Sequence, residues 1–346
     1  MVNAGVPGSL VGGWYNVDRL GHIVVIEVFR ALIGLALLTV AADHLVLGSS
    51  RLARRLRISP VVVGVAVIGL GTSAPEFLVS GLAAAHGDTG IAVGSIVGSN
   101  ILNLTLLLGI AAIVAPIPVT SAVIRREAPL AVAAIGLFGL LAVVVGLNGR
   151  TAAVLAAAGV AALWLLVRWA QAGRAEAALA VQVEAFLAAD GDAIAPENAP
   201  RPAWVEPVRA LLGLLGVLAG AQLLVGGASA IAESLGVPQV VIGSTLVALG
   251  TSLPELVASV QAQRRGESDL VVGNLFGSNL FNSLIGGAVI GFAGHTTAYA
   301  GTALALTMVL TAGLAWALLR RGLRLTRLEG VALVVTYALV APLLLS

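Results

Sequence analysis

Apolar runs of about 20 residues follow one another along nearly the whole chain, and no other feature limits its possible folds so strongly. Coiled as a helix, a run of this length crosses a hydrocarbon layer about 30 Å thick. Of the 346 residues, 59% are hydrophobic and 10% are charged, whereas soluble proteins carry roughly 25% charged residues. The sequence therefore predicts an all-α polytopic membrane protein.

One long polar interruption at about 170–206 divides the apolar runs into two groups of five. It contains an Ala- and Glu-rich stretch followed by the Pro-rich APENAPRPAW, which predicts an amphipathic helix at the membrane interface and then a flexible linker. The predicted units are an N-terminal tail at 1–22, a first five-helix repeat at 23–169, the linker at 170–206 and a second five-helix repeat at 207–346. The ten predicted transmembrane helices cover 23–48, 60–85, 91–115, 129–146, 151–169, 207–232, 238–262, 269–293, 299–319 and 327–345.

The positive charges predict how the chain is oriented. All 19 basic residues are arginine, and with the N-terminus outside, sixteen fall on the inner side and only Arg19, Arg30 and Arg150 on the outer side. Because arginine-rich loops stay in the cytoplasm, both termini are expected outside the inner (plasma) membrane and the linker inside. Arginines confined to short loops do not indicate a nucleic-acid partner. The sixteen are Arg51, Arg54, Arg55, Arg57, Arg125, Arg126, Arg168, Arg174, Arg201, Arg209, Arg264, Arg265, Arg320, Arg321, Arg324 and Arg327.

Missing residue types and motifs exclude several kinds of chemistry. The chain has no cysteine, so disulfides, thiolate catalysis and cysteine metal sites are ruled out. It has no G-x-S-x-G, no HExxH and no aspartate pair, so the chain is not predicted to be an enzyme such as an intramembrane hydrolase. Residues 1–21 are Gly-rich without a basic n-region, so no cleaved signal peptide is predicted there.

Two short motifs occur twice at the same spacing. GTSAPE begins at Gly71 and GTSLPE at Gly250, while GSIVGSNILN begins at Gly94 and GNLFGSNLFN at Gly273. Both pairs are 179 residues apart, which makes coincidence a poor explanation. Each unit has five spans, an odd number, so the second copy must lie upside down relative to the first. Inverted repeats with Gly- and Pro-interrupted helices indicate a secondary transporter with its site near the membrane midplane.

The GTSxPE motif puts a carboxylate at a predicted helix break. Pro75 lacks a backbone donor and frees a carbonyl one turn earlier, and unwound backbone at membrane depth occurs only where it is buried in protein or lines a cavity. Glu76 follows near the N-terminus of the new half-helix, where the dipole favours an anion. A carboxylate at mid-membrane costs roughly 2.5 kcal/mol or more and indicates function. Pro254 and Glu255 repeat the arrangement.

The neighbouring oxygens predict the kind of ligand. Carboxylates, hydroxyls and free carbonyls together suit Ca²⁺ or Na⁺ and not soft metals. The triplets GSN at 98–100 and 277–279 predict a second pair of helix interruptions facing the glutamates. Ser99 and Asn103 are four residues apart and share a helix face, as do Ser278 and Asn282. The hydroxyls beside the two proline breaks are those of Thr72, Ser73, Thr251 and Ser252.

Some of these residues also have purely structural interpretations. Gly94 and Gly98, like their second-repeat counterparts, fit small-xxx-small helix packing as well as a site. Hydroxyls in membrane helices usually bond their own backbone. Asp43 aligns with Gln222 at the repeat spacing and is interpreted as an anchor at the end of its helix.

The two motif pairs resemble the α-repeats of the cation/calcium exchanger superfamily, most closely those of its prokaryotic sodium/calcium antiporters. The resemblance covers the ten-span layout, the central cytoplasmic loop and both motif pairs. It implies a sodium/calcium exchanger fold in which the second, third, seventh and eighth spans enclose the ion sites. It also implies that the first and sixth spans slide across that core during alternating access.

By position, the resemblance implies a role for each motif residue. The Ca²⁺ carboxylates would be Glu76 and Glu255, with carbonyls at Thr72 and Thr251. The flanking Na⁺ sites would share Ser73, Ser99, Ser252 and Ser278. The central polar positions of the third and eighth spans would be Asn103 and Asn282. No cofactor and no protein partner is implied, and the ligands are the transported ions, Ca²⁺ with Na⁺ or H⁺, in a lipid bilayer.

Two positions depart from the family pattern. Asn282 stands where well-studied sodium/calcium exchangers carry Asp, and Ser95 stands where the family usually has Asn, as at Asn274 here. Two carboxylates neutralise one Ca²⁺, whereas three Na⁺ in the same enclosure would leave one uncompensated charge in low dielectric. Coupling to two protons or two Na⁺ is therefore favoured more than in an Asp-bearing relative. Two close carboxylates titrate as a coupled pair, which predicts acid-sensitive transport.

The leading hypothesis is a secondary antiporter that exchanges Ca²⁺ for Na⁺ by alternating access. The alternative is an H⁺/Ca²⁺ exchanger in which Glu76 and Glu255 carry the protons. A passive cation channel needs only one continuous pore, so the inverted repeats argue against it.

Overall fold

The computed structural model describes residues 11–119, 124–187, 202–237 and 248–344, which are almost entirely helical. The elements of the first half are α1 (Val11–Leu56), α2 (Pro60–Val63), η1 (Gly64–Gly69), α3 (Leu70–Thr72), α4 (Ala74–His86), α5 (Thr89–Leu102), η2 (Asn103–Leu107), α6 (Leu108–Val114), β1 (Ile117–Pro118), α8 (Glu127–Val144) and α9 (Gly149–Leu187). Those of the second half are α10 (Val205–Ser234), α12 (Ala248–Thr251), α13 (Leu253–Arg264), α14 (Ser268–Phe281), η5 (Asn282–Gly286), α15 (Gly287–Ala293), α16 (Thr302–Gly322), β2 (Arg324–Leu325) and α17 (Arg327–Leu344). The η elements are π-helical stretches inside longer helices.

The predicted membrane-spanning architecture agrees with these helices. Eight of the described helices are long and apolar enough to cross a membrane, and the bent pair formed by 60–72 and 74–86 makes a ninth. The remaining predicted span, 238–262, lies partly outside the described residues, and its described part is α12 and α13. The fold is the predicted polytopic helical one, to which β1 and β2 add two residues each.

Two helix boundaries differ from the prediction. α1 begins at Val11, so residues 11–22 of the predicted tail are helical, while the membrane-length apolar part of the helix is Val24–Leu56. α9 continues to Leu187, beyond its membrane-length apolar part at Gly149–Ala172, so the helix predicted in the first half of the linker is continuous with the preceding span. The physical reason is composition, because this stretch is rich in Ala, Glu, Gln and Leu and has no proline to end a helix. The rest of the predicted linker, 188–201, lies outside the described residues.

Two short backbone pairings support the inversion of the repeats. β1 pairs antiparallel with β2, with Ile117 opposite Leu325. An isolated bridge joins Leu147 to Ala298, where the Leu147 amide donates to the Ala298 carbonyl at 2.6 Å. A shift by the repeat spacing of 179 residues carries Ile117 and Leu325 to within two residues of Ala298 and Leu147. The same pairing is therefore made twice with the halves exchanged, as inverted repeats require.

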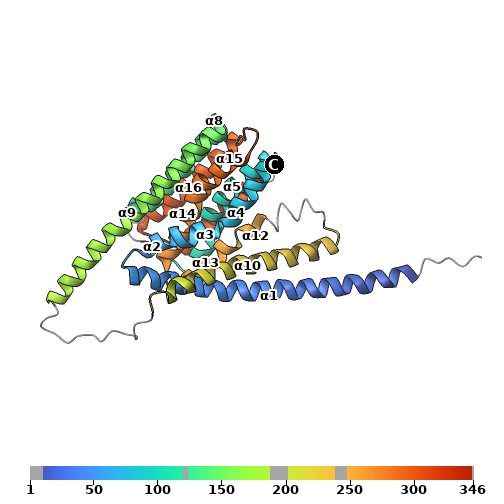
Figure 1. The fold of residues 1–346 in the computed structure, drawn as a ribbon, viewed down its shortest axis with the longest axis horizontal. Coiled ribbons are helices and arrows are strands. Elements are labelled where there is room, and N and C mark those ends of the chain that lie inside the picture. The colour runs from blue at the N-terminus through green and yellow to red at the C-terminus, as the bar shows by residue number, and fades with distance from the viewer. Residues whose placement is uncertain (1–10, 120–123, 188–201, 238–247, 345–346) are drawn as a thin grey trace, which may run out of the picture.

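α1 and α10 pack against each other along most of their lengths and lie obliquely to the other helices (Figure 1). A Cβ at Gly213 would lie 2.4 Å from the backbone nitrogen of Leu45, and one at Gly220 would lie 2.5 Å from that of Leu38. The two backbones therefore touch, which only small residues allow. The small residues of this contact recur every seven positions, at Gly34, Ala41 and Gly48 on α1 and at Gly213, Gly220 and Gly227 on α10.

Replacing Gly220 by leucine is expected to separate α1 from α10. The new side chain would clash with the backbone of Leu38, and overpacking of this kind typically costs about 1–3 kcal/mol or more because backbone cannot yield like a side chain. We expect a lower melting temperature and less monodisperse protein in detergent. Gly313→Leu is the matched control, because no described atom lies within 4 Å of a Cβ at Gly313 in α16. If both variants lost the same amount of thermal stability, the contact between the α1 and α10 backbones would not be the cause of the loss.

Candidate cation site

The predicted helix breaks at the two GTSxPE motifs are present. α3 ends at Thr72 and α4 begins at Ala74, and the segments on either side meet at 42°. Pro75 lies in the first turn of α4, where its missing donor is tolerated, while the carbonyl one turn earlier loses its helical partner. α12 and α13 are separated in the same way at Ser252, with Pro254 in the first turn of α13.

The predicted interruptions at the GSN triplets are wrong. α5 and α14 run unbroken through 98–100 and 277–279. The irregular segments begin a few residues later, as π-helices that start at Asn103 and Asn282. Because the triplets contain no proline, every backbone donor there can stay in the helix. Short π-helical stretches inside α-helices are frequent at functional sites, so the two asparagines are better markers of the site than the triplets.

Each glutamate is bonded to a serine from the other repeat. Glu76 and Glu255 are both 0% exposed. Ser252 Oγ donates to Glu76 Oε1 at 3.2 Å. Ser73 Oγ donates to Glu255 Oε1 at 3.3 Å. The two helix breaks therefore meet, and the carboxylates of both repeats belong to one site.

Four buried oxygens at this site have no hydrogen-bond donor among the described residues. They are the Oε2 atoms of Glu76 and Glu255 and the Oδ1 atoms of Asn103 and Asn282. Buried polar atoms normally have a partner, and an atom left without one carries its full desolvation cost. Carboxylate and amide oxygens are the ligands that hard cations such as Ca²⁺ prefer. The donor set therefore fits a cation, which would supply the missing contacts.

The serines predicted as ligands are placed unequally. Ser278 Oγ lies 3.1 Å from the Gly69 carbonyl and 3.5 Å from Glu255 Oε1, so it belongs to the same cluster as Ser73. Ser99, at the equivalent position on α5, is buried, but its hydroxyl makes no hydrogen bond within the described part of the chain. The structure thus brings three of the four serines to a carboxylate.

The predicted threonines lie at the ends of the half-helices that precede the breaks. Thr72 Oγ1 donates to the Ile68 carbonyl at 2.9 Å and lies 3.4 Å from Asn274 Oδ1. Its hydroxyl therefore bonds its own helix, as is usual in membrane helices. Thr251 is the last residue of α12. Both threonine carbonyls stand one residue before a break, where a ligand can reach backbone oxygen.

Further asparagines of the repeated motifs complete the polar interior. Asn103 Nδ2 donates to Asn279 Oδ1 at 2.9 Å, and Asn279 Nδ2 donates to the Asn100 carbonyl at 2.7 Å. Asn100 Nδ2 in turn donates to Ser283 Oγ at 2.9 Å. Asn100 and Asn279 are not among the predicted ligands, although both stand in the repeated GSN triplet, and that repetition is the signal that points to them.

The glycines of the GNxxG motif in the second repeat have the packing role. A Cβ at Gly273 would lie 2.5 Å from the Val61 carbonyl, and one at Gly277 would lie 2.6 Å from Val65 Cα. This close approach of α14 to α2 and η1 carries the polar residues of α14 to the first helix break. The small-xxx-small interpretation is confirmed for these two glycines.

The interpretation of Asp43 as an end-of-helix anchor is wrong, because α1 continues well beyond it and its carboxylate bonds another helix. Arg265 donates to it from Nε at 2.7 Å and from Nη2 at 2.6 Å. Gln261 Nε2 adds a third donor at 2.5 Å. Nearby, Arg54 pairs with Glu267 at 3.2 Å. These pairs attach α1 to the end of α13 and the start of α14.

Asp43→Asn is expected to loosen α1 from α13. The pair with Arg265 is bidentate but about one-third exposed, with side-chain exposures of 31% and 34%, so its contribution is about 1 kcal/mol. Conformations with α1 displaced should become roughly fivefold more populated. Since the chain has no cysteine, spin labels on one introduced cysteine in α1 and one in α13 report their separation directly. Glu27→Gln, which breaks an ion pair within α1, should leave the distance distribution unchanged, and so would Asp43→Asn if the attachment were unimportant.

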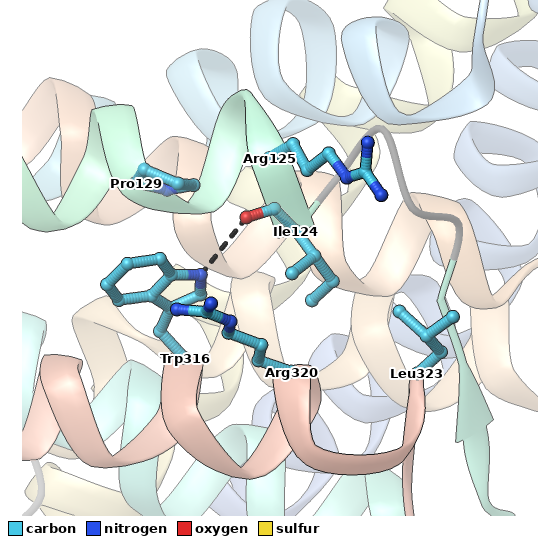
Figure 2. Close-up of a pocket in the computed structure, with 6 residues that line it drawn as sticks. All are labelled: Ile124, Arg125, Pro129, Trp316, Arg320 and Leu323. Carbon is cyan, nitrogen blue, oxygen red and sulfur yellow. Dashed lines mark hydrogen bonds between the residues drawn. The ribbon is translucent and has the colours of Figure 1, made fainter.

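A cavity of about 450 Å³ lies elsewhere, between the start of α8 and the end of α16 (Figure 2). Trp316 Nε1 donates to the Ile124 carbonyl at 3.1 Å, and the Arg320 guanidinium lies 5.9 Å from the Trp316 ring centre. The lining includes Arg125 as a second guanidinium and has no acidic side chain among the described residues. Two guanidinium groups repel cations, so this cavity is not part of the cation site.

Two inverted helical repeats that enclose paired carboxylates at broken helices define a membrane transporter of the inverted-repeat class. The chain belongs to the sodium/calcium exchanger protein family, whose sequence model matches residues 27–172 and 206–345. It is similar to CaxA of Alkalimonas amylolytica, with 38% identity over 88% of this chain and 94% of that protein. The sodium/calcium exchanger MaX1 of Methanosarcina acetivorans is 28% identical over 91% of this chain and 97% of its own. A solved structure of the sodium-calcium exchanger NCX_Mj matches with a TM-score of 0.78 at 32% identity, over 92% of this chain and 99% of that one.

Proposed function

We propose that this protein is a secondary antiporter that exchanges Ca²⁺ for Na⁺ across the membrane by alternating access. The observation that carries the proposal is the pair of buried glutamates, each bonded to a serine of the other repeat and each with one oxygen that has no partner among the described residues. Two carboxylates neutralise one Ca²⁺, and a membrane-buried charge without a counter-ion is costly. Family membership and a relative named as a sodium/calcium exchanger support the assignment.

In this proposal the bound ions share one set of oxygen ligands. Ca²⁺ lies between Glu76 and Glu255, and backbone carbonyls at Thr72 and Thr251 complete its shell. Asn103 and Asn282 provide neutral oxygens at the centre. The Na⁺ ions use the same carboxylates together with the flanking hydroxyls of Ser73, Ser99, Ser252 and Ser278. Because Ca²⁺ and Na⁺ compete for these ligands, binding of one displaces the other, which is what exchange requires.

The α1–α10 pair is the moving part in this proposal. It packs as a unit through glycine contacts and lies obliquely across the remaining helices (Figure 1). Its displacement would open the glutamates first to one side of the membrane and then to the other. With the arginine-rich loops in the cytoplasm, both termini lie outside the plasma membrane, and the 170–206 linker joins the repeats 23–169 and 207–346 on the inside.

A second candidate is H⁺/Ca²⁺ exchange, and Asn282 is the observation that favours it. Its amide is neutral and fully buried, so the described residues of the site include two carboxylates and no third. Three Na⁺ would leave one uncompensated positive charge in a low-dielectric enclosure. Two protons on Glu76 and Glu255 would replace one Ca²⁺ without a residual charge.

Ca²⁺ uptake into proteoliposomes loaded with Na⁺ tests the proposal, with equal pH on both sides and the membrane potential clamped. We expect uptake that depends on internal Na⁺. Uptake that instead requires an acidic lumen would replace Na⁺ by H⁺ as the coupling ion. Uptake that needs neither internal ion would indicate a passive channel and overturn both candidates.

A further inference from the structure

The two repeats hold their glutamates unequally, and the difference centres on Asn274 of α14. Its Nδ2 donates to the Glu255 carbonyl at 3.2 Å and to Ser259 Oγ at 2.9 Å, and its Oδ1 lies 3.4 Å from Thr72 Oγ1. The side chain is only 1% exposed. These two hydrogen bonds and the contact with Thr72, together called the amide bridge, join α14 to the first two turns of α13 and to the end of α3 in the other repeat.

The first repeat has equivalent positions without the amide bridge. The repeat spacing carries Asn274 to Ser95 and Ser259 to Ser80. Ser95 is only partly buried, and its hydroxyl makes no hydrogen bond with any residue that the structure describes. Ser80 Oγ is fully buried and likewise has no partner in the described ranges. A serine hydroxyl donates one hydrogen bond where the asparagine Nδ2 donates two, and the serine side chain is shorter, so it cannot donate to a backbone carbonyl and to a second side chain at once as Asn274 does.

We propose that the amide bridge of Asn274 holds the second-repeat glutamate in one position, whereas Ser95 leaves the first-repeat glutamate without this support, so that α4 is the adjustable half of the cation site. Asn274 is thus a positioning residue that acts through the backbone of Glu255. Ser95 sets the difference between the halves. The hydroxyl of Ser80, which has no partner among the described residues, lies one turn beyond Glu76 and marks where the missing support would attach.

The unequal support has a consequence for exchange, and this consequence rests on the proposed function. Ca²⁺ binds several oxygen ligands in a flexible geometry. A site that binds Ca²⁺ and Na⁺ in turn must therefore change the positions of its ligands. One fixed carboxylate keeps the cation centred, while the adjustable one follows the change of ion. If both glutamates were supported equally, the rate at which Ca²⁺ and Na⁺ replace each other should fall, while the affinities for Ca²⁺ and Na⁺ should change less.

Ser95→Asn tests the proposal by supplying the missing amide to the full-length protein in detergent. The position is partly exposed, so the substitution does not fall in the fully buried core. Hydrogen exchange of the backbone amides in the first two turns of α4, measured without transported ions, should slow about fivefold, the effect of roughly one added hydrogen bond. Exchange in α13 should stay as it is. In proteoliposomes the maximal rate of Ca²⁺ exchange should fall while KM for Ca²⁺ stays unchanged.

A double-mutant cycle identifies the partner of the new amide. Ser95→Ala adds no side-chain amide, so the backbone amides of α4 should show the same hydrogen exchange as in the wild type. Combining Ser95→Asn with Ser80→Ala should remove most of the added protection if the amide bonds the Ser80 hydroxyl. The reciprocal change, Asn274→Ser, should speed exchange in the first turns of α13, a shift that general destabilisation would not confine to one helix.

Unchanged exchange in α4 after Ser95→Asn would overturn the proposal, as would equal protection with and without the Ser80 hydroxyl. The hydrogen-exchange measurements are made without transported ions. They therefore test the unequal support of the two glutamates even if no Na⁺-dependent Ca²⁺ uptake is found. Absence of Ca²⁺ transport by the wild type would overturn the proposed function alone.

Discussion

Glu76→Gln and Glu255→Gln are each expected to abolish Ca²⁺ transport in a protein that still folds. Glutamine keeps an oxygen that can accept from Ser252 or Ser73 but removes a negative charge that Ca²⁺ requires. Interactions with a charged group contribute about 1.5–3 kcal/mol each, so loss of one carboxylate should lower the Ca²⁺ affinity roughly a hundredfold. Removing a buried charge does not destabilise the empty site. Ca²⁺ uptake and the rise in melting temperature on adding Ca²⁺ measure both effects.

Glu329→Gln is the matched control for this pair. Glu329 accepts from the backbone and hydroxyl of Thr326 at 2.8 and 2.7 Å at the start of α17, so its loss affects a helix end and not the site. Such a change costs about 1 kcal/mol of stability and should leave transport intact. Normal transport by Glu76→Gln or by Glu255→Gln would mean that the two glutamates do not share one ion site.

Asn282→Asp is expected to lower the Na⁺ concentration that half-saturates Ca²⁺ exchange, by about tenfold. Both polar atoms of the Asn282 side chain are buried without a partner in the described part of the chain, so a carboxylate there loses no existing hydrogen bond. One added charge about 4 Å from a cation contributes about 4 kcal/mol at an effective dielectric of 20, and desolvation removes a large part of this gain. Without cations, the third carboxylate should destabilise the protein, and Na⁺ should restore its melting temperature.

Asn103→Asp provides the comparison within the same site. Asn103 Nδ2 donates to Asn279 Oδ1 at 2.9 Å, and a carboxylate would place two acceptors against each other. This variant should therefore lose stability in the presence and absence of Na⁺. If Asn282→Asp shows the Na⁺ dependence of the wild type, the neutral residue at 282 does not determine the coupling ion.

The proline breaks could be predicted from the sequence, whereas the π-helices could not. Pro75 and Pro254 remove a backbone donor wherever they stand, so their effect is local and does not depend on the rest of the fold. The stretches that begin at Asn103 and Asn282 have every donor available, and nothing in their composition requires a wider turn. Both stretches pack against helices of the other repeat, and the sequence does not record these contacts, so the GSN triplets were a misleading guide.

The partners of α1 were also beyond prediction. The seven-residue spacing of small residues on α1 and α10 is visible in the sequence, but many membrane helices carry such patterns. Asp43 has a charged partner only because α13 ends beside it, and Arg265 stands 222 positions further along the chain. The continuation of α9 to Leu187 is a different case. The composition of this stretch predicts a helix, and only its continuity with the preceding span was not predicted.

By itself, the sequence determined that the chain crosses the membrane many times and that its halves are inverted. It also pointed to Glu76 and Glu255 as the candidate cation ligands. Hydropathy and the effect of proline are local properties of the chain, and the inversion follows from the odd number of spans in each repeat. None of these inferences requires a tertiary structure. Only the tertiary structure decided that each glutamate bonds the serine of the other repeat, across separations of 176 and 182 residues. It also decided that Asn274 supports one glutamate and that Ser95 leaves the other without this support. These contacts depend on how the two repeats cross near the membrane midplane, and the identity of a residue does not record which distant side chain it will meet.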